Sequence, residues 1–404
     1  MGGNAFSERL PTAVFPRMSP AFYNSLKARI MPRLEALYHL VAVPPEAPGK
    51  LDYGDLDVVV CQPKKIQEGI PLSECVTLAE IEQALGSVHS IPLPGDRTSN
   101  FAVPIQQDEV QHFAVDQEAI REEKLDLAQL YIQIDLHFCE DIESCKSHIL
   151  FQSYGELGMI LGMLAKTVGL TWTVAGLKVG GSALHLGPCR LNFRLRLQLF
   201  RYRTYIPDSP YTRLTTSHLE IFEFFGLAHD VHERGFTTAQ EVFDWVATSR
   251  FFNPHRLLPA MQSLGFKGKR KMYAEFLDYL GSLIASAESE ERLDIHAIQD
   301  EALALFGKRK EFDDAVREKY LFCEAKRVFS GSLVKEWTGL EYWRDVKTVT
   351  DAMRVQVLVG IDDENKDWRE EMIKLNDEER KALALKLKEE LIPPKSTEDA
   401  IAVA

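Results

Sequence analysis

Hydrophobic and polar positions follow two different periods along this chain, and the change of period divides it. Up to about residue 206, short alternating or β-branched runs typical of strands are interleaved with helical segments, whereas helical spacing prevails afterwards. The pattern predicts an α+β fold with a mixed sheet and flanking helices over 1–206. We expect an all-helical domain over 207–360, then a charged helical segment and a disordered tail over 361–404.

Within the first domain, the apolar spacing predicts a helix over 23–40, a short strand over 41–43 and a second strand from Asp55 through three valines. Residues 62–125 have mixed character and are interpreted as an insertion. It includes a short helix over 77–85, which opens with Thr77 and with Glu80 three residues later, a capping-box pattern. A further strand is predicted over 131–138 and a helix over 153–168.

The helical domain is predicted from a 3.6-residue apolar period with short polar joints. A second capping box, Thr238 with Glu241, marks one helix start. The expected helices are 219–225, 239–249, 270–285, 298–306 and 312–329.

Three carboxylates stand where strands should be apolar. Asp55 and Asp57 are two residues apart at the start of a strand, so both side chains project from one face of the sheet. Asp135 interrupts the apolar run 131–138, and a buried unpaired charge is costly unless it is paired, protonated or bound to metal. For Asp55 and Asp57 the alternative is a turn followed by an ordinary strand. For Asp135 and His137 it is the wet face of an edge strand.

The sequence Gly54-Asp55-Leu56-Asp57 followed by three valines, with Asp135 on a later strand, resembles the DNA polymerase beta-like nucleotidyltransferase superfamily over roughly the first 150 residues. The resemblance implies transfer of a nucleotidyl group from a nucleoside triphosphate, such as ATP, to a hydroxyl. It also implies two Mg²⁺ ions, with Mn²⁺ as a substitute, held by Asp55, Asp57 and Asp135, with Asp57 bridging them. Such ions lie about 3.5–4 Å apart and act on the attacking and leaving oxygens.

The chain departs from that pattern at Pro44-Pro45, where the superfamily carries Gly-Gly or Gly-Ser for triphosphate binding. An N-terminal loop of Gly2, Gly3 and Asn4 is a candidate replacement, because glycines let the backbone approach phosphates closely. A frayed terminus is the alternative.

Further candidates for substrate binding are a base-stacking Tyr154, a phosphate-binding Lys166, and Arg194 and Arg196 on an alternating strand over 190–199. Core packing and solvent exposure are the alternatives for Tyr154 and Lys166. For the arginines, the alternative is the wet face of an antiparallel strand.

The composition of the 404 residues, 45% hydrophobic and 10% aromatic, predicts a globular protein. No apolar run is long enough to span a membrane and no signal-peptide layout is present, so we expect an intracellular protein, cytoplasmic or nuclear. The cysteines are expected to be reduced, without a disulfide-linked partner. His137, Cys139, Cys145 and His148 come nearest to a zinc set, but their gaps fit no common motif.

A formal charge of −13 argues against a protein that coats nucleic acid by bulk attraction. An RNA 3′ end, a small molecule and a protein hydroxyl all remain as acceptors. A catalytically inactive binding or regulatory protein is the main alternative, favoured by Pro44-Pro45. A metal-dependent nuclease is a weaker one.

Overall fold

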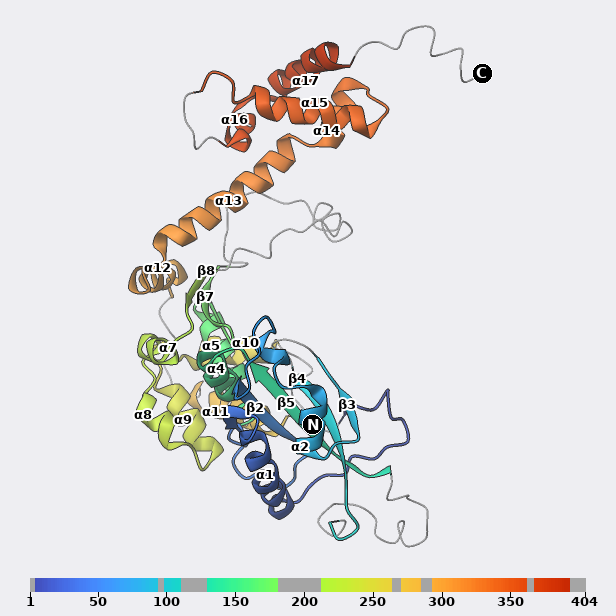
Figure 1. Ribbon diagram of the computed structural model, residues 1–404. Coiled ribbons are helices and arrows are strands. Elements are labelled where there is room, and N and C mark those ends of the chain that lie inside the picture. The colour runs from blue at the N-terminus through green and yellow to red at the C-terminus, as the bar shows by residue number, and fades with distance from the viewer. Residues whose placement is uncertain are drawn as a thin grey trace. The chain divides into compact units, whose positions relative to one another are not determined.

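The computed structural model describes residues 4–93, 98–109, 129–180, 212–263, 270–284, 293–361 and 367–392. These residues form two compact units (Figure 1). The first includes the described residues up to Gly180 together with Arg213–Gly307, and the second includes Thr212 and the described residues from Lys308 onward.

A mixed five-stranded sheet forms the centre of the first unit. Strands β2 and β5 are parallel, and all the other neighbouring strands are antiparallel. The order across the sheet is β1 (Tyr38–Ala42), β2 (Asp55–Pro63), β5 (Tyr131–Cys139), β4 (Thr98–Pro104) and β3 (His89–Ile91). The predicted α+β class with a mixed sheet is therefore confirmed.

The alternation of side chains along β2 and β5 gives the sheet two different faces. Leu56, Val58 and Val60 of β2 are fully buried on one face and pack with apolar residues of β5 and of helix α1 (Pro20–Glu35). Asp55 and Asp57 have the opposite parity and project from the other face, where Val59 and Cys61 follow them. Burial of the first face thus determines where the carboxylates point.

Helix α4 (Ile142–Gln152) packs on the carboxylate-bearing face, and α5 (Leu157–Thr167) packs on α4. Gly158 makes the contact between the helices close, since a Cβ there would lie 2.5 Å from the Phe151 carbonyl oxygen. A three-stranded sheet follows in the order β6 (Leu170–Thr173), β7 (Gly176–Val179) and β8 (Thr212–Thr215).

The other helices of the first unit include α2 (Leu78–Leu85) and η1 (Leu72–Glu74), which precede β3, and six helices in the described residues after β8. Both predicted capping boxes are present, with Thr77 at the start of α2 and Thr238 at the start of α9. The six helices are α7 (His218–Phe225), α8 (His229–Arg234), α9 (Ala239–Ala247), α10 (Pro254–Gln262), α11 (Lys271–Ile284) and α12 (Ile295–Leu305).

The second unit is helical and has its own core, in which Val334, Met353 and Met372 are fully buried. Its helices are α13 (Arg309–Val328), α14 (Gly331–Thr338), α15 (Trp343–Gln356), α16 (Trp368–Lys374) and α17 (Asp377–Leu391). Among the described residues, no helix has the length and apolar character needed to cross a membrane. The described cysteines are free thiols.

Three features differ from the sequence predictions. Helix α1 ends at Glu35 rather than near 40, because Tyr38–Ala42 pairs with β2. The segment 62–125 is no separate insertion where it is described, since it supplies β3 and β4 of the central sheet. The boundary between units falls at 307/308 rather than at 206/207 and 360/361, because α7 to α12 belong to the unit that contains the sheet.

Candidate active site

The three predicted aspartates lie together on one face of the central sheet. In the parallel ladder of β2 and β5, Asp57 is opposite Asp135, and Asp55 is opposite Gln133. Adjacent strands are about 4.8 Å apart, so the carboxylates of Asp57 and Asp135 are direct neighbours, with Asp55 two residues along the same face. The sequence predicted this convergence; the chemical roles of the three residues stay predictions.

Burial and neighbouring negative charge change the acidity of two of these carboxylates, Asp57 and Asp135. Burial, followed by the negative charges of Asp55 and Asp135, raises the pKa of Asp57 to about 7. Burial also raises the pKa of Asp135 to about 6, against the lowering effect of hydrogen bonds from Asn100 and Gln133. Because these like charges repel one another, the site favours a proton or a cation between them.

The donor set fits a hard divalent cation. Oxygen atoms are the only ligand atoms that the three aspartates offer, and Mg²⁺ or Mn²⁺ binds carboxylate oxygens in preference to nitrogen or sulfur. The mutual repulsion just described is the electrostatic condition that such a cation would relieve. Asp55, Asp57 and Asp135 are therefore the residues that would hold the ions.

Two amide side chains orient Asp135, and the sequence did not reveal either of them. Asn100, opposite Asp135 on β4, donates from Nδ2 to Asp135 Oδ1 at 2.7 Å. Gln133 donates from Nε2 to the same oxygen at 2.9 Å. Gln133 is two residues before Asp135 and so shares its face of β5, which is the one signal that could have identified it. Such contacts fix the orientation of a ligand.

The start of the chain lies near this network. The backbone N–H of Ala5 donates to Gln133 Oε1 at 3.0 Å, and the Asn4 carbonyl accepts a hydrogen bond from the Ser7 hydroxyl at 3.0 Å. Gly2 and Gly3 lie outside the described residues. Gln133 therefore links the segment that follows the predicted phosphate loop to Asp135, because its side chain bonds both to Ala5 and to Asp135.

A cleft of about 440 Å³ opens beside Asp55 and Asp57. One wall is the connection between β1 and β2, including Lys50, and another is the junction of α4 and α5, including Gln152. Arg270 and Lys271, at the start of α11, also line it. The sequence did not single these cations out, because lysine and arginine at a helix start resemble any solvated surface.

The cations of the cleft already have acidic partners. Lys50 pairs with Glu46, and Arg270 lies 3.5 Å from Glu156. Lys271 lies 3.7 Å from Glu275. Arg270 and Lys271 are largely exposed, so their pairs are weak and can be exchanged for a stronger anion such as phosphate.

The other predicted substrate contacts are placed differently. Tyr154 is buried, and its hydroxyl accepts a hydrogen bond from the Phe236 N–H at 3.3 Å, so it has no open ring face for a base. Lys166 is exposed in the last turn of α5 and does not line the cleft. Arg194 and Arg196 lie outside the described residues.

Neither the protein-family models nor the curated proteins with which the sequence was compared match this chain. The interpretation of the site therefore depends on its own geometry and chemistry.

Proposed function

We propose that this chain is a divalent-cation-dependent nucleotidyltransferase, which moves a nucleotidyl group from a nucleoside triphosphate to an acceptor hydroxyl. The observation that carries the proposal is the register that sets Asp57 opposite Asp135, with Asp55 on the same face of β2. A mixed sheet with this arrangement at its centre also agrees with the superfamily that the sequence resembles.

Asp55, Asp57 and Asp135 would hold two Mg²⁺ ions. When bound, the ions activate the attacking oxygen and stabilise the leaving pyrophosphate. We assign to Asp135 the role of accepting the proton of the acceptor hydroxyl, and hydrogen bonds from Asn100 and Gln133 hold its carboxylate in one orientation. The chain would thereby supply both the metal ligands and a proton acceptor of fixed orientation.

The phosphates of the nucleotide would lie against Lys50, Arg270 and Lys271 of the cleft. A triphosphate carries more negative charge than a single carboxylate, so it competes effectively for Arg270 and Lys271, whose own side chains are largely exposed. This arrangement assigns phosphate binding to side chains rather than to a backbone loop at Pro44-Pro45.

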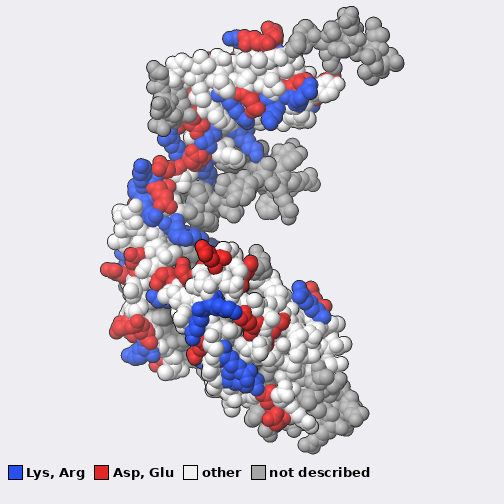
Figure 2. All heavy atoms as spheres, in the orientation of Figure 1, with Lys and Arg blue, Asp and Glu red and all other residues white. Residues whose placement is uncertain are grey.

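The acceptor is expected to touch the protein over a limited area. On the face shown in Figure 2, acidic and basic side chains are interspersed and form no extended positive surface among the residues described. Long polynucleotides bind through many phosphate contacts. We therefore favour an RNA 3′ end bound at its last nucleotides, or a small acceptor, over a duplex.

The test is nucleotide transfer by Asp57→Asn, with Asp52→Asn as its matched control. Asp52 lies just before β2, in the connection from β1; it pairs with Arg17 and does not line the cleft. With Mg²⁺, each of the four labelled triphosphates and cellular RNA, Asp57→Asn should lose about 10³-fold in rate, the equivalent of about 4 kcal/mol. Asp52→Asn should keep the wild-type rate. Equal rates for Asp57→Asn and wild type would refute the proposal.

One observation favours a second candidate, a nucleotide-binding protein without catalysis. Pro44 and Pro45 have no backbone N–H, so the start of the connection between β1 and β2 offers no such donors to a phosphate at these two positions. That candidate predicts Mg²⁺-dependent binding of a non-hydrolysable triphosphate analogue, which Asp57→Asn would abolish, with no transfer by wild type to any acceptor.

A further inference from the structure

The carboxylate-bearing face of the sheet continues past the aspartates into a different chemistry. After Asp57 and Asp135, the next same-face partners in the ladder are Val59 with His137 and then Cys61 with Cys139. A strand advances about 3.3 Å per residue, so His137 lies about 7 Å beyond Asp135. Oxygen ligands thus give way to nitrogen and sulfur along one strand.

Helix α4 brings a second pair of such side chains to the same place. Cys145 and His148 are three residues apart, so they project from the same side of the helix. Asp141 fixes the start of α4, since its Oδ1 accepts a hydrogen bond from the Ser144 N–H at 2.7 Å. Cys145 is fully buried against Cys139 and Cys61 of the sheet.

His137, Cys139 and His148 have the geometry of a metal-ligand set. Their ligand atoms all lie within 4.8 Å of one another. The two imidazole rings are stacked, with centroids 3.7 Å apart. Cys139 is fully buried and His137 is 5% exposed, whereas His148 is partly buried, so two of the three side chains are shielded from solvent.

A further contact orients His137 as a ligand would be oriented. Its Nδ1 lies 2.9 Å from the hydroxyl of Thr98, on the neighbouring strand β4. A hydrogen bond at one ring nitrogen fixes the ring and directs the other nitrogen to a metal, an arrangement that accompanies most metal-bound histidines.

We propose that His137, Cys139 and His148 bind one Zn²⁺ ion, independently of the aspartate site and of the function proposed above. One thiolate and two imidazoles suit Zn²⁺ or Co²⁺, and they do not suit Mg²⁺. A tetrahedral ion takes a fourth ligand, which is the sulfur of Cys145 or a water molecule.

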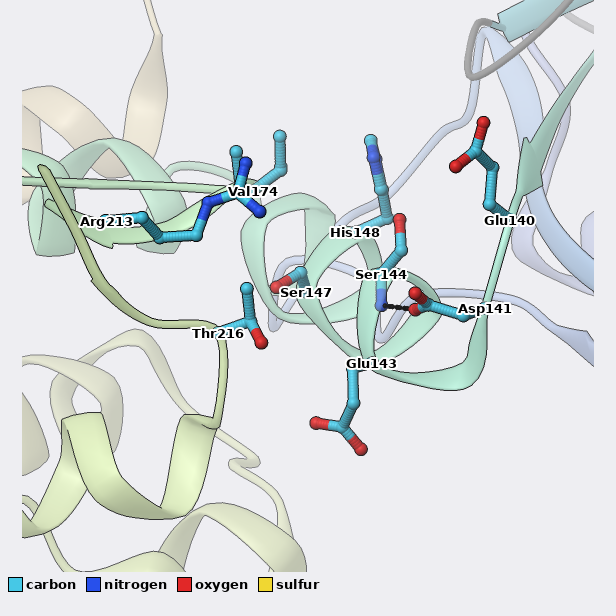
Figure 3. A pocket seen from close by; sticks show the side chains of 10 residues that line it. Glu140, Asp141, Glu143, Ser144, Ser147, His148, Val174, Arg213 and Thr216 are labelled. Carbon is cyan, nitrogen blue, oxygen red and sulfur yellow. Dashed lines mark hydrogen bonds between the residues drawn. The ribbon is translucent and has the colours of Figure 1, made fainter. Parts of the chain in front are cut away.

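The site has a route for entry. His148 lines a pocket of about 220 Å³ together with Glu140, Ser147 and Arg213. Figure 3 shows Ser144, Ser147 and His148 of α4 along this pocket, with Arg213 approaching from one side and Glu140 and Asp141 from the other. An ion or a water molecule reaches His148 from this pocket, whereas Cys139 lies in the protein interior.

Zinc at this position would fasten α4 to the sheet. The helix carries the ligand His148 on its second turn and ends at Gln152, which lines the cleft beside Asp55 and Asp57. Loss of the ion should therefore loosen α4 and lower the melting temperature of the first unit even when no nucleotide is present.

The experiment uses the full-length chain stripped of metal and titrated with Zn²⁺ or Co²⁺ ions. Wild type should bind one Zn²⁺ per chain and, with Co²⁺, show thiolate-to-cobalt charge-transfer absorption. Cys139→Ser and His148→Gln should weaken Zn²⁺ binding by at least a hundredfold, and Cys139→Ser should reduce the intensity of that absorption. Zn²⁺ should also raise the melting temperature of wild type and leave that of His148→Gln unchanged.

Matched controls keep the test specific. Cys75→Ser removes another fully buried thiol, and His39→Gln removes another histidine. Asp57→Asn removes a carboxylate of the aspartate site. Each of these three variants should bind one Zn²⁺ per chain, as wild type does. If Cys139→Ser fails to fold, His148→Gln decides, because His148 is only partly buried. A wild type that takes up no Zn²⁺ at micromolar concentration, or a His148→Gln protein that binds it normally, would overturn the proposal.

Discussion

The Asp57→Asn substitution should make the metal-free protein more stable while removing its activity. Burial and the neighbouring charges raise the pKa of Asp57 from its ordinary value of 3.8 to about 7. The folded state therefore binds a proton at this residue more tightly than the unfolded chain does. Between pH 3.8 and pH 7 the Asp57 carboxyl ionises in the unfolded chain but stays largely protonated in the folded state. Ionisation therefore stabilises the unfolded chain, and the free energy of unfolding of the wild type falls as the pH rises over that range.

The size of the effect follows from this pKa difference. At about 1.36 kcal/mol per pKa unit, the raised pKa of Asp57 lowers the free energy of unfolding by about 4 kcal/mol at pH 8. Solvent in the open cleft reduces the penalty, so we expect Asp57→Asn to gain about 2 kcal/mol over wild type at pH 8. At pH 5 the gain should be less than half as large, because most of the wild-type loss occurs between pH 5 and pH 7.

Urea unfolding with a chelator present, followed by tryptophan fluorescence at pH 5 and pH 8, measures both values. Added Mg²⁺ should narrow the difference at pH 8, since it stabilises wild type by binding between the carboxylates and has less to bind in the variant. Asp52→Asn is the control and should show no gain, because the Asp52 carboxylate is exposed and paired with Arg17. A metal-free Asp57→Asn protein that is less stable than wild type at pH 8 would refute the reasoning.

Three further predictions test the surroundings of the site. Gln133→Met removes a hydrogen bond to Asp135 and should lower the rate of nucleotidyl transfer about 10–100-fold. In a metal titration, it should also raise the Mg²⁺ concentration needed for half-maximal rate. Lys271→Gln should raise the KM for the triphosphate about tenfold in steady-state kinetics, whereas Lys166→Gln, outside the cleft lining, should leave it unchanged. Gly158→Ala would place its Cβ 2.5 Å from a backbone oxygen of α4 and should destabilise the fold by more than about 2 kcal/mol in urea unfolding. Gly281→Ala, a helical glycine whose added Cβ meets nothing within 4 Å, should instead stabilise it by up to about 1 kcal/mol.

The sequence predicted the carboxylates because each of them breaks a strong local pattern. Asp55 and Asp57 are two residues apart and come just before a run of three valines, and Asp135 is a charged residue within an apolar strand. A strand of this kind is buried on at least one face, so the position of a charged residue in it is informative. The sequence of β2 or β5 alone does not specify its pairing partner. A domain contains few buried strands, however, so each of them has few possible partners.

Other parts of the site depended on tertiary structure and left no local trace. Helix α4 was missed because its sequence mixes small, polar and apolar residues without a helical stripe, and packing on the sheet stabilises it. Helix α1 was predicted too long because Leu37 and Leu40 preserve helical spacing, although pairing with β2 draws Tyr38–Ala42 into a strand. Asn100 was missed because an amide on a strand of mixed polarity suggests no particular partner.

Dependence on tertiary structure also explains why motif spacing does not identify His137, Cys139 and His148 as a metal-ligand set. Zinc motifs in sequence are short because both ligands of a pair come from one turn or one helix. Here one pair comes from alternate residues of β5 and the other from successive turns of α4, so only the docking of the helix on the sheet brings His148 to Cys139. Because α4 also ends beside the aspartates, its position on the sheet determines both the geometry of the sulfur and nitrogen cluster and one wall of the cleft.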